Sequence, residues 1–449
     1  MRVITLLLAL ALGCSGQPAP RLLLLVTVDT LRADHIGVYG NPLGLTPRID
    51  ALAGESLRFS ASYAPASYTL PSMASLHTGL YPEEVGIFAN HNLFRGSSVT
   101  LAEILRLEGW RTGAAVSNYV LRAGTGIETG FDVYDDAFTQ KEANRDQPER
   151  TAEHTTDAAL DVLDALRSSP GAGIFLWVHY QDPHGPYAPP PGLRERYLEQ
   201  AIAAEDGRRE LPTRGINAIG AIPEYQQVDG RRDVGFYRAG YAGEVRFMDD
   251  ELARLFDGLA ERGLLADASI ALTADHGESL GESDYWFSHG EFLTDALVRV
   301  PLLLRVPGTA PGVRDDVASL VDLLPTLAAL AGLPDVNAVG RFQGRNLLAA
   351  DAATAPARAY LATLMGSAQK RWGWVEDGRV FVRTENPRGS ATEELRGLHD
   401  GAPIRDAEQR AAMRGALARF RSELRVPKAV EQELSPRDRE MLRQLGYLE

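Results

Sequence analysis

Residues 21–30, "RLLLLVTVDT", give the clearest indication of the fold class of this chain. Its apolar side chains run almost without interruption to Asp29, a pattern typical of a strand buried on both faces of a parallel sheet. "GIFLWVHYQDPHGPY" (173–187) and "SIALTADHGES" (269–279) repeat the design, each with polar residues directly after the apolar run. "VRVPLLLRVPG" (298–308) is a further strand candidate. These segments together predict a mostly parallel central sheet.

Amphipathic helices are expected between these strands. One apolar stripe at helical spacing consists of Ala159, Val162, Leu163 and Leu166. A longer stripe consists of Tyr241, Val245, Met248, Leu252, Leu255, Phe256 and Leu259. "SLVDLLPTLAALAGLP" (319–334) predicts another helix. Because alternating strands and helices join by right-handed crossovers, we predict an α/β fold with a doubly wound, mostly parallel sheet and helices on both faces.

The C-terminal part of the chain has a different pattern. "RWGWVEDGRVFVRT" (371–384) predicts a hairpin with Asp377-Gly378 at its turn, and charged helical sequence follows. We therefore expect a catalytic domain over residues 21–349 and a small C-terminal α+β subdomain, with hairpin and helix, over residues 350–449.

The first residues, "MRVITLLLALALGCSGQPAP", have the pattern of an export signal. The apolar run from Val3 to Leu12 is too short to span a bilayer. "ALGC" resembles a bacterial lipobox, which implies cleavage before Cys14 and lipidation of its thiol. The prediction is a signal peptide (1–13), a lipidated tether (14–20) and a membrane-anchored envelope protein in the periplasm or on the cell surface. The alternatives are an ordinary secretory signal and a cytoplasmic protein.

Charge and cysteine content narrow the classes of partner. The formal net charge of -14 argues against non-specific nucleic-acid binding, because phosphate-tracking surfaces are usually basic. A small anionic substrate in a local site remains compatible with it. Cys14 is the only cysteine of the sequence, so no intramolecular disulfide can form.

Polar residues follow the three apolar strands, at the sheet edge where open α/β folds bind ligands. These residues are Asp29, His179, Asp182, His184, Asp275 and His276. Carboxylates and imidazoles together suit Zn²⁺ or Mn²⁺, whereas an all-oxygen site suits Mg²⁺ or Ca²⁺ better. The pattern therefore predicts a site for one divalent cation.

Thr69 lies in "SYTLPSMASLHTGLYP" (67–82), just ahead of a predicted helix with Pro71 in its first turn. Its hydroxyl is a weak nucleophile, but coordination to a cation lowers the pKa of such a group. The positive end of the helix favours an alkoxide or a bound oxyanion there. Thr69 is thus either a nucleophile or a helix-entry residue with a structural hydroxyl.

Six blocks in this order resemble the sulfatase family of the alkaline phosphatase superfamily over about residues 22–335. They are "LLLLVTVDTLRADHIGVYG", "YTLPSMASLHTGLYP", "HYQDPHGPY", "LTADHGES", "HGEFLTDALVRVPLLLRVPG" and "SLVDLLPTLAALAGLP". The resemblance implies that Asp29, Asp275 and His276 bind the metal and that Thr69 occupies the nucleophile position. It places His184 and His289 near the transferred group or the leaving oxygen, with His179 close by.

The departures from this family bear on the chemistry. Sulfatases carry a Cys or Ser that is oxidised to formylglycine, with Arg four residues later, where this chain has Thr69 and Met73. Threonine cannot give the aldehyde, because its β-carbon carries a methyl group, so no formylglycine is expected. The family's second Asp is Thr30, and its Lys-x-His block reads Ser117-Asn118. Two cationic groups that grip sulfate are therefore missing, and Asn118 joins His179 as a predicted substrate-binding residue.

The remaining set of Asp29, Thr69, Asp275 and His276 resembles the single-metal site of threonine-dependent phosphotransferases and phosphodiesterases, such as lipoteichoic-acid-synthase-like enzymes. The prediction is a metal-dependent hydrolase or transferase acting on phosphoesters, diesters first, with an envelope lipid or glycan as a candidate substrate. One alternative is a sulfatase without formylglycine. Another is an inactive ligand-binding lipoprotein, against which the intact four residues argue.

A second cation on Asp182, His184 and His289 is disfavoured, because "QDPHGPY" is more closely spaced than the expected Asp-to-His motif. Arg32 and Asp34 are interpreted as a solvated helix start. The remaining residues of this kind are expected to be structural (His35, His77) or on a loop surface (Glu278, Glu282).

Overall fold

The computed structural model describes residues 21–94, 98–141, 148–215, 218–333, 336, 340–350, 352, 357–363, 369–398, 401–427 and 435–444. The predicted signal peptide, Cys14 and the tether lie outside these residues. Within the described ranges, every helix is too short or too polar to cross a bilayer.

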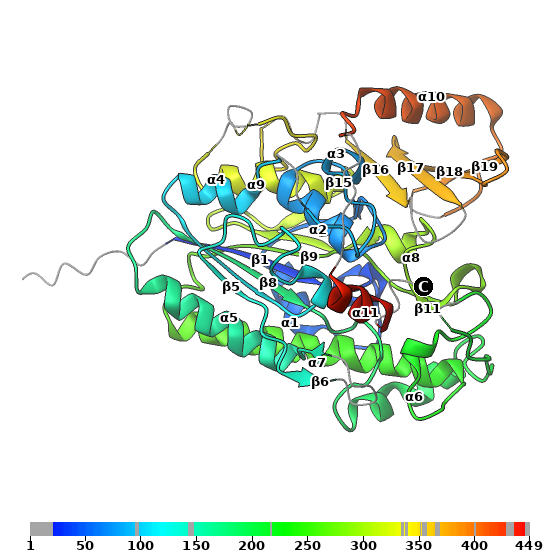
Figure 1. Ribbon diagram of the computed structural model, residues 1–449, viewed down its shortest axis with the longest axis horizontal. Coiled ribbons are helices and arrows are strands. Elements are labelled where there is room, and N and C mark those ends of the chain that lie inside the picture. Colours follow the sequence, from blue (N-terminus) through cyan, green and yellow to red (C-terminus); the bar gives the residue numbers. More distant parts are fainter. Residues whose placement is uncertain are drawn as a thin grey trace, which may run out of the picture.

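An eight-stranded sheet forms the centre of the molecule, in the order β14-β2-β13-β9-β1-β8-β4-β5 (Figure 1). Its strands are β1 (Leu22–Val28), β2 (Leu57–Phe59), β4 (Arg111–Val116), β5 (Val133–Asp135), β8 (Ile174–Tyr180), β9 (Ser269–Ala274), β13 (Leu302–Arg305) and β14 (Gly312–Arg314). β1, β4, β5, β8 and β9 pair in parallel, whereas β13 runs antiparallel to β9 and β2. The predicted fold class is confirmed, with a mixed sheet.

All seven residues of β1 are buried, as the apolar run predicts. The register places Val28 opposite Tyr180 of β8 on one side and Ala274 of β9 on the other. The residues that follow, Asp29 and Asp275, therefore leave the sheet at the same edge.

Helices cover both faces of this sheet (Figure 1). One face carries α1 (Pro47–Ala53), α5 (Ala152–Arg167) and α7 (Val234–Glu261), with α6 (Leu193–Ala203) packed along α7. The other carries α2 (Thr69–Thr78), α4 (Leu101–Leu107) and α9 (Leu323–Leu330). Both predicted apolar stripes, on α5 and α7, are buried, so they do face the core.

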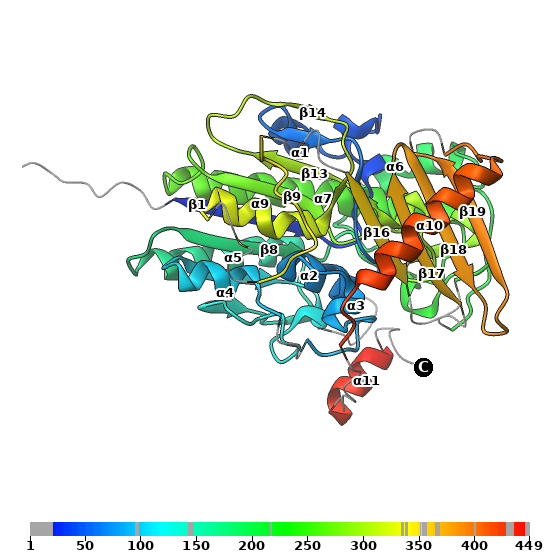
Figure 2. The same cartoon turned by 90° about the horizontal axis from the view of Figure 1, so that it is seen from above.

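The C-terminal part folds as a separate four-stranded antiparallel sheet in the order β16-β17-β18-β19. Its strands are β16 (Arg358–Thr363), β17 (Lys370–Glu376), β18 (Arg379–Glu385) and β19 (Ala391–Gly397). α10 (Ala407–Glu423) lies across one face of it, whereas α11 (Pro436–Gln444) lies away from this sheet (Figure 2), and its Asp438 pairs with Arg122 (2.6 Å). The predicted hairpin is confirmed as β17–β18, with Asp377 and Gly378 both at positive φ in the turn.

Candidate active site

The predicted ligands meet where β1, β8 and β9 end. Directly after Asp29 the chain turns sharply, because Thr30 adopts a φ of 56°, which is unusual for a β-branched residue. The turn is held by two hydrogen bonds. The Thr30 N–H donates to Asp275 Oδ1 (3.1 Å), and the Tyr241 hydroxyl donates to the Thr30 carbonyl (2.7 Å). The strained turn thus fixes Asp29 beside Asp275.

Side chains from three strand ends form one ligand group. Asp29, His179 and Asp275 each offer a ligand atom, and these atoms lie within 4.8 Å of one another. His276 Nε2 lies 3.4 Å from Asp275 Oδ2 and 3.9 Å from Asp29 Oδ1. Among the described residues, Asp29 Oδ1, Asp275 Oδ2 and His179 Nε2 are buried without any hydrogen-bond partner. Because buried polar atoms are normally satisfied, this donor set fits a divalent cation.

The carboxylate pair is electrostatically costly without such a cation. Burial raises the pKa of Asp275, and the nearby Asp29 carboxylate raises it further. Burial also opposes the ionisation of Asp29, but the surrounding imidazoles, His184 first, hold the pKa of Asp29 below its usual value. Two adjacent buried carboxylates disfavour each other's charge. A bound cation removes this conflict.

His276 is oriented as a metal ligand by its own backbone. Its Nδ1 lies 2.8 Å from the Gly277 carbonyl oxygen, which can only accept a hydrogen bond. Nδ1 therefore carries the proton, and the lone pair of Nε2 faces the ligand group.

Thr69 is the first residue of α2 and is fully buried. Its Oγ1 lies 3.4 Å from His276 Nε2, so the hydroxyl sits between the helix N-terminus and the ligand group. The first turn of α2 is fixed on both sides. The Leu70 N–H donates to Asn90 Oδ1 (2.9 Å), and the Ser72 hydroxyl donates to the Asp275 carbonyl (2.5 Å). Two of the three ligands that the resemblance implies are therefore directly tied to the segment that carries Thr69.

The rings of His184 and His289 lie close to that of His276. Their ring centroids are 5.1 Å apart, and the ring of His289 lies 4.5 Å from that of His276. Burial lowers the pKa of both imidazoles, that of His289 to about 4. Burial thus favours the neutral form of both rings.

Glu278 does not lie on a loop surface. It is fully buried, with Oε1 3.4 Å from His289 Nδ1, and its Oε2 accepts a hydrogen bond from the Tyr187 hydroxyl (3.0 Å). The cause is Gly277, whose N–H donates to the Leu297 carbonyl and whose Cβ, if present, would lie 2.0 Å from the Ala296 carbonyl oxygen. This close approach turns the next residue inward. No local pattern of the sequence indicates this inward position.

Arg32 differs from the expected solvated position as well. Its side chain is 7% exposed, and its guanidinium donates to the Glu278 carbonyl (3.0 Å). It also pairs with Glu282 (2.8 Å) and with Asp34 (2.7 Å), whose side chain is 61% exposed as expected. Arg32 thus holds the segment that carries Glu278.

Two further residues have contacts that sequence patterns did not indicate. The Asn118 amide donates to Asp29 Oδ2, while its Oδ1 accepts from the Val120 N–H (2.9 Å). Asp182 interacts with Glu244 of α7.

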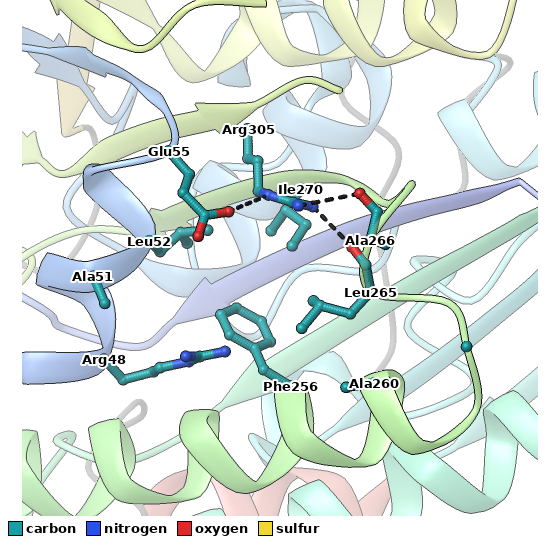
Figure 3. A pocket seen from close by; sticks show the side chains of 11 residues that line it. Arg48, Ala51, Leu52, Glu55, Phe256, Ala260, Leu265, Ala266, Ile270 and Arg305 are labelled. Atoms are coloured by element: carbon teal, nitrogen blue, oxygen red, sulfur yellow. Dashed lines mark hydrogen bonds and ion pairs between the residues drawn. The ribbon is translucent and has the colours of Figure 1, made fainter. Parts of the chain in front are cut away.

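A separate pocket of about 340 Å³ lies at the opposite edge of the sheet (Figure 3). The Arg305 guanidinium donates hydrogen bonds to Glu55 Oε2 (2.9 Å) and to backbone carbonyls. The Arg48 guanidinium stacks over the ring of Phe256. No group among these lining residues resembles the ligand set at the strand ends.

This chain is similar to a known protein family and to several known proteins. The family model described as Sulfatase matches residues 21–333. Arylsulfatase A of Bos taurus is 32% identical over 368 residues, which cover 75% of this chain and 69% of that protein. Choline-sulfatase of Rhizobium meliloti is 27% identical over 337 residues, or 64% of this chain and 63% of that protein.

Solved structures show the same fold at lower identity. A phosphonate monoester hydrolase of Agrobacterium radiobacter superimposes with a TM-score of 0.62 at 19% identity, covering 90% of this chain and 95% of that one. A protein solved with its substrate D-glucosamine-2-N,6-O-disulfate gives a TM-score of 0.69, also at 19% identity, over 90% of this chain and 97% of that one.

Proposed function

The chain belongs to the sulfatase family of hydrolases, and we propose that it cleaves phosphoesters. Phosphodiesters are its preferred substrates in this proposal, and Thr69 is the nucleophile. The observation that carries the proposal is the position of the Thr69 hydroxyl. It is buried at the N-terminus of α2, 3.4 Å from His276 Nε2 and beside a group of buried, unsatisfied ligand atoms. A helix-entry residue with a purely structural hydroxyl has no need of such neighbours.

Asp29, Asp275 and His276 would hold the cation in this proposal. When bound, a divalent cation lowers the pKa of a neighbouring hydroxyl and offsets negative charge on phosphoryl oxygens. The Thr69 oxygen then forms a bond to phosphorus as the bond to the leaving oxygen breaks. The proton lost by Thr69 appears, in the overall balance, on the leaving alcohol, and we assign its transfer to His184 and His289. Water or a second alcohol cleaves the phosphothreonine and restores the hydroxyl.

The charge of the site supports a singly charged substrate. Within the described part of the chain, no hydrogen bond or ion pair joins the Thr69, Asp29 or Asp275 side chain to a Lys or Arg. Arg32 reaches the site only through the Glu278 carbonyl, and Asp34 and Glu282 already neutralise it. A phosphodiester carries one negative charge where a phosphate monoester carries up to two. The diester therefore needs less cationic compensation.

Thr69 variants test this proposal. Thr69→Ala should lower turnover of bis(p-nitrophenyl) phosphate on the order of 10³-fold or more, because the nucleophile is lost. Thr69→Ser should keep measurable activity, since it retains a hydroxyl. Thr78→Ala, at the other end of α2, is the matched control and should stay active. After an acid quench during turnover, mass spectrometry should find phosphate on the peptide that contains Thr69. Full activity in Thr69→Ala would reject the nucleophile.

A sulfate-ester hydrolase is the second candidate, favoured by the similarity to arylsulfatase A of Bos taurus. A sulfate monoester also carries one negative charge, so charge alone does not separate the two substrates. Rates on p-nitrophenyl sulfate and on the phosphodiester, measured on one preparation, do separate them. A higher kcat/KM for the sulfate would replace the first proposal with the second.

We further propose that the protein is anchored in the bacterial envelope through Cys14, as its lipobox-like "ALGC" suggests. Cys14→Ser should move the protein from the membrane fraction to the soluble fraction, because lipidation needs the thiol. Fractionation with and without detergent measures this. A wild-type protein that is fully soluble without detergent would contradict the anchor.

A further inference from the structure

We propose that His179 is a fourth protein ligand of the cation, acting through Nε2 beside Asp29, Asp275 and His276. The inference rests on the metal site of the proposed function and deepens it. The sequence placed His179 among the substrate-binding residues, but its imidazole lies inside the ligand group.

Distances favour coordination over a hydrogen bond. His179 is fully buried, and its Nε2 lies 3.6 Å from Asp29 Oδ2. That separation exceeds the 2.7–3.2 Å typical of N–H···O hydrogen bonds. Within the described residues Nε2 has no hydrogen-bond partner, although it shares a 4.8 Å cluster with oxygens of Asp29 and Asp275. Two ligand atoms of one cation are commonly separated by such distances, since neither bonds to the other.

The other side of the ring offers a partner to Nδ1. His179 Nδ1 lies 2.8 Å from Thr27 Oγ1 on the neighbouring strand, where the sheet register pairs the two residues. Trp177 Nε1–H donates to the same Oγ1 (2.8 Å). A hydroxyl oxygen accepts two hydrogen bonds, so Thr27 can receive Nδ1–H together with the indole N–H. This tautomer leaves the Nε2 lone pair for a metal, as partners of ligating histidines generally do.

The backbone of His179 is fixed as well. Its carbonyl accepts hydrogen bonds from the Ser117 N–H (3.1 Å) and the Ser117 hydroxyl (2.5 Å). With the ring tied to Thr27 and the backbone tied to Ser117, the imidazole has little freedom to turn towards a substrate.

Proton NMR of the Co²⁺-substituted protein tests this ligand directly. A coordinated imidazole gives a strongly shifted, exchangeable N–H resonance, and wild type should show two, from His179 and His276. His179→Gln should lose one of them and bind Co²⁺ about 100-fold more weakly, given that even outer partners of ligands contribute 10–100-fold. His154→Gln is the control, because its ring contacts Thr151 at the start of α5 (2.8 Å), and it should keep both resonances and the affinity.

Other outcomes are equally decisive. An unchanged resonance count and affinity in folded His179→Gln would overturn the assignment. If that variant does not fold, Thr27→Val is used instead, because loss of the Nδ1 partner must shift the His179 resonance, and an unmoved spectrum also overturns it. Asp275→Asn separates the two levels of inference. If it abolishes Co²⁺ binding while His179→Gln does not, only this inference fails, whereas binding unaffected by Asp275→Asn rejects the metal site itself.

Discussion

Asp275 shows how a single buried carboxylate links the metal site to pH. In the metal-free protein its pKa is raised, first by burial and then by the charge of Asp29. The protonated form is therefore favoured near neutral pH, yet a carboxylate must be deprotonated to bind a cation. Cation binding has to displace this proton.

We expect cation binding at pH 7 to release protons and the apparent affinity to rise as pH rises towards the raised pKa of Asp275. The sign follows because protons and the cation compete for the same oxygens, and alkaline pH removes the competitor. Calorimetric titrations in two buffers with different ionisation enthalpies count the protons. The Asp275→Asn side chain has no such proton to release. If this variant still binds the cation and still releases the proton, the proton comes from another residue.

Single residues also mark what sequence alone can predict of the site. Asp29, Asp275, His276 and Thr69 were predictable, because each stands at a strand end or helix start and matches a family block. The inward position of Glu278 depends on a contact between Gly277 and Ala296 from a different segment. The burial of Arg32 likewise depends on Glu278 and Glu282, which are remote in sequence. Such contacts have no local pattern to reveal them.

At the scale of elements, turn chemistry was the most dependable signal in the C-terminal part. Asp377 and Gly378 connect β17 and β18 with φ values of 49° and 71°, which a two-residue turn between twisted strands requires. The predicted hairpin could be located to the residue because glycine and aspartate tolerate this conformation. By contrast, the antiparallel direction of β13 was not predictable from its apolar run, because both directions bury it equally.

Gly378→Ala should destabilise the protein by about 1–2 kcal/mol, because a β-carbon disfavours the left-handed conformation. Gly415→Ala is the matched control, since Gly415 lies inside α10 and a helical glycine is about 0.5–1 kcal/mol less stable than alanine. An added β-carbon there approaches only the flexible tip of Arg419, at 3.3 Å. Urea unfolding should therefore move the two midpoints in opposite directions. Equal shifts would show that the turn conformation does not limit stability.

At the scale of the whole molecule, the site exists only because the sheet is complete. Asp29, His179 and Asp275 follow or end three neighbouring strands, and Thr69 begins a helix on one face of the sheet. Segments that are far apart in the sequence thus meet at one edge. The fold class was predictable because each apolar strand is locally visible, whereas strand order and the contacts between loops arise only from assembly.

A cation that bridges these segments should stabilise the whole chain against unfolding, since the unfolded chain does not hold the ligands together. At a free concentration about 100 times Kd, binding adds about 2.7 kcal/mol. With an unfolding entropy of about 2.1 cal/mol/K per residue, the 449-residue chain should gain about 3 °C in Tm. Differential scanning calorimetry with EDTA, and then with excess Mn²⁺ or Zn²⁺, measures this gain. Asp275→Asn should lose most of the increase, because one ligand is gone. The opposite result is a Tm that responds to neither cation, in the wild type and in the variant alike. It would mean that the strand ends do not share an ion and that protons alone balance the buried carboxylates.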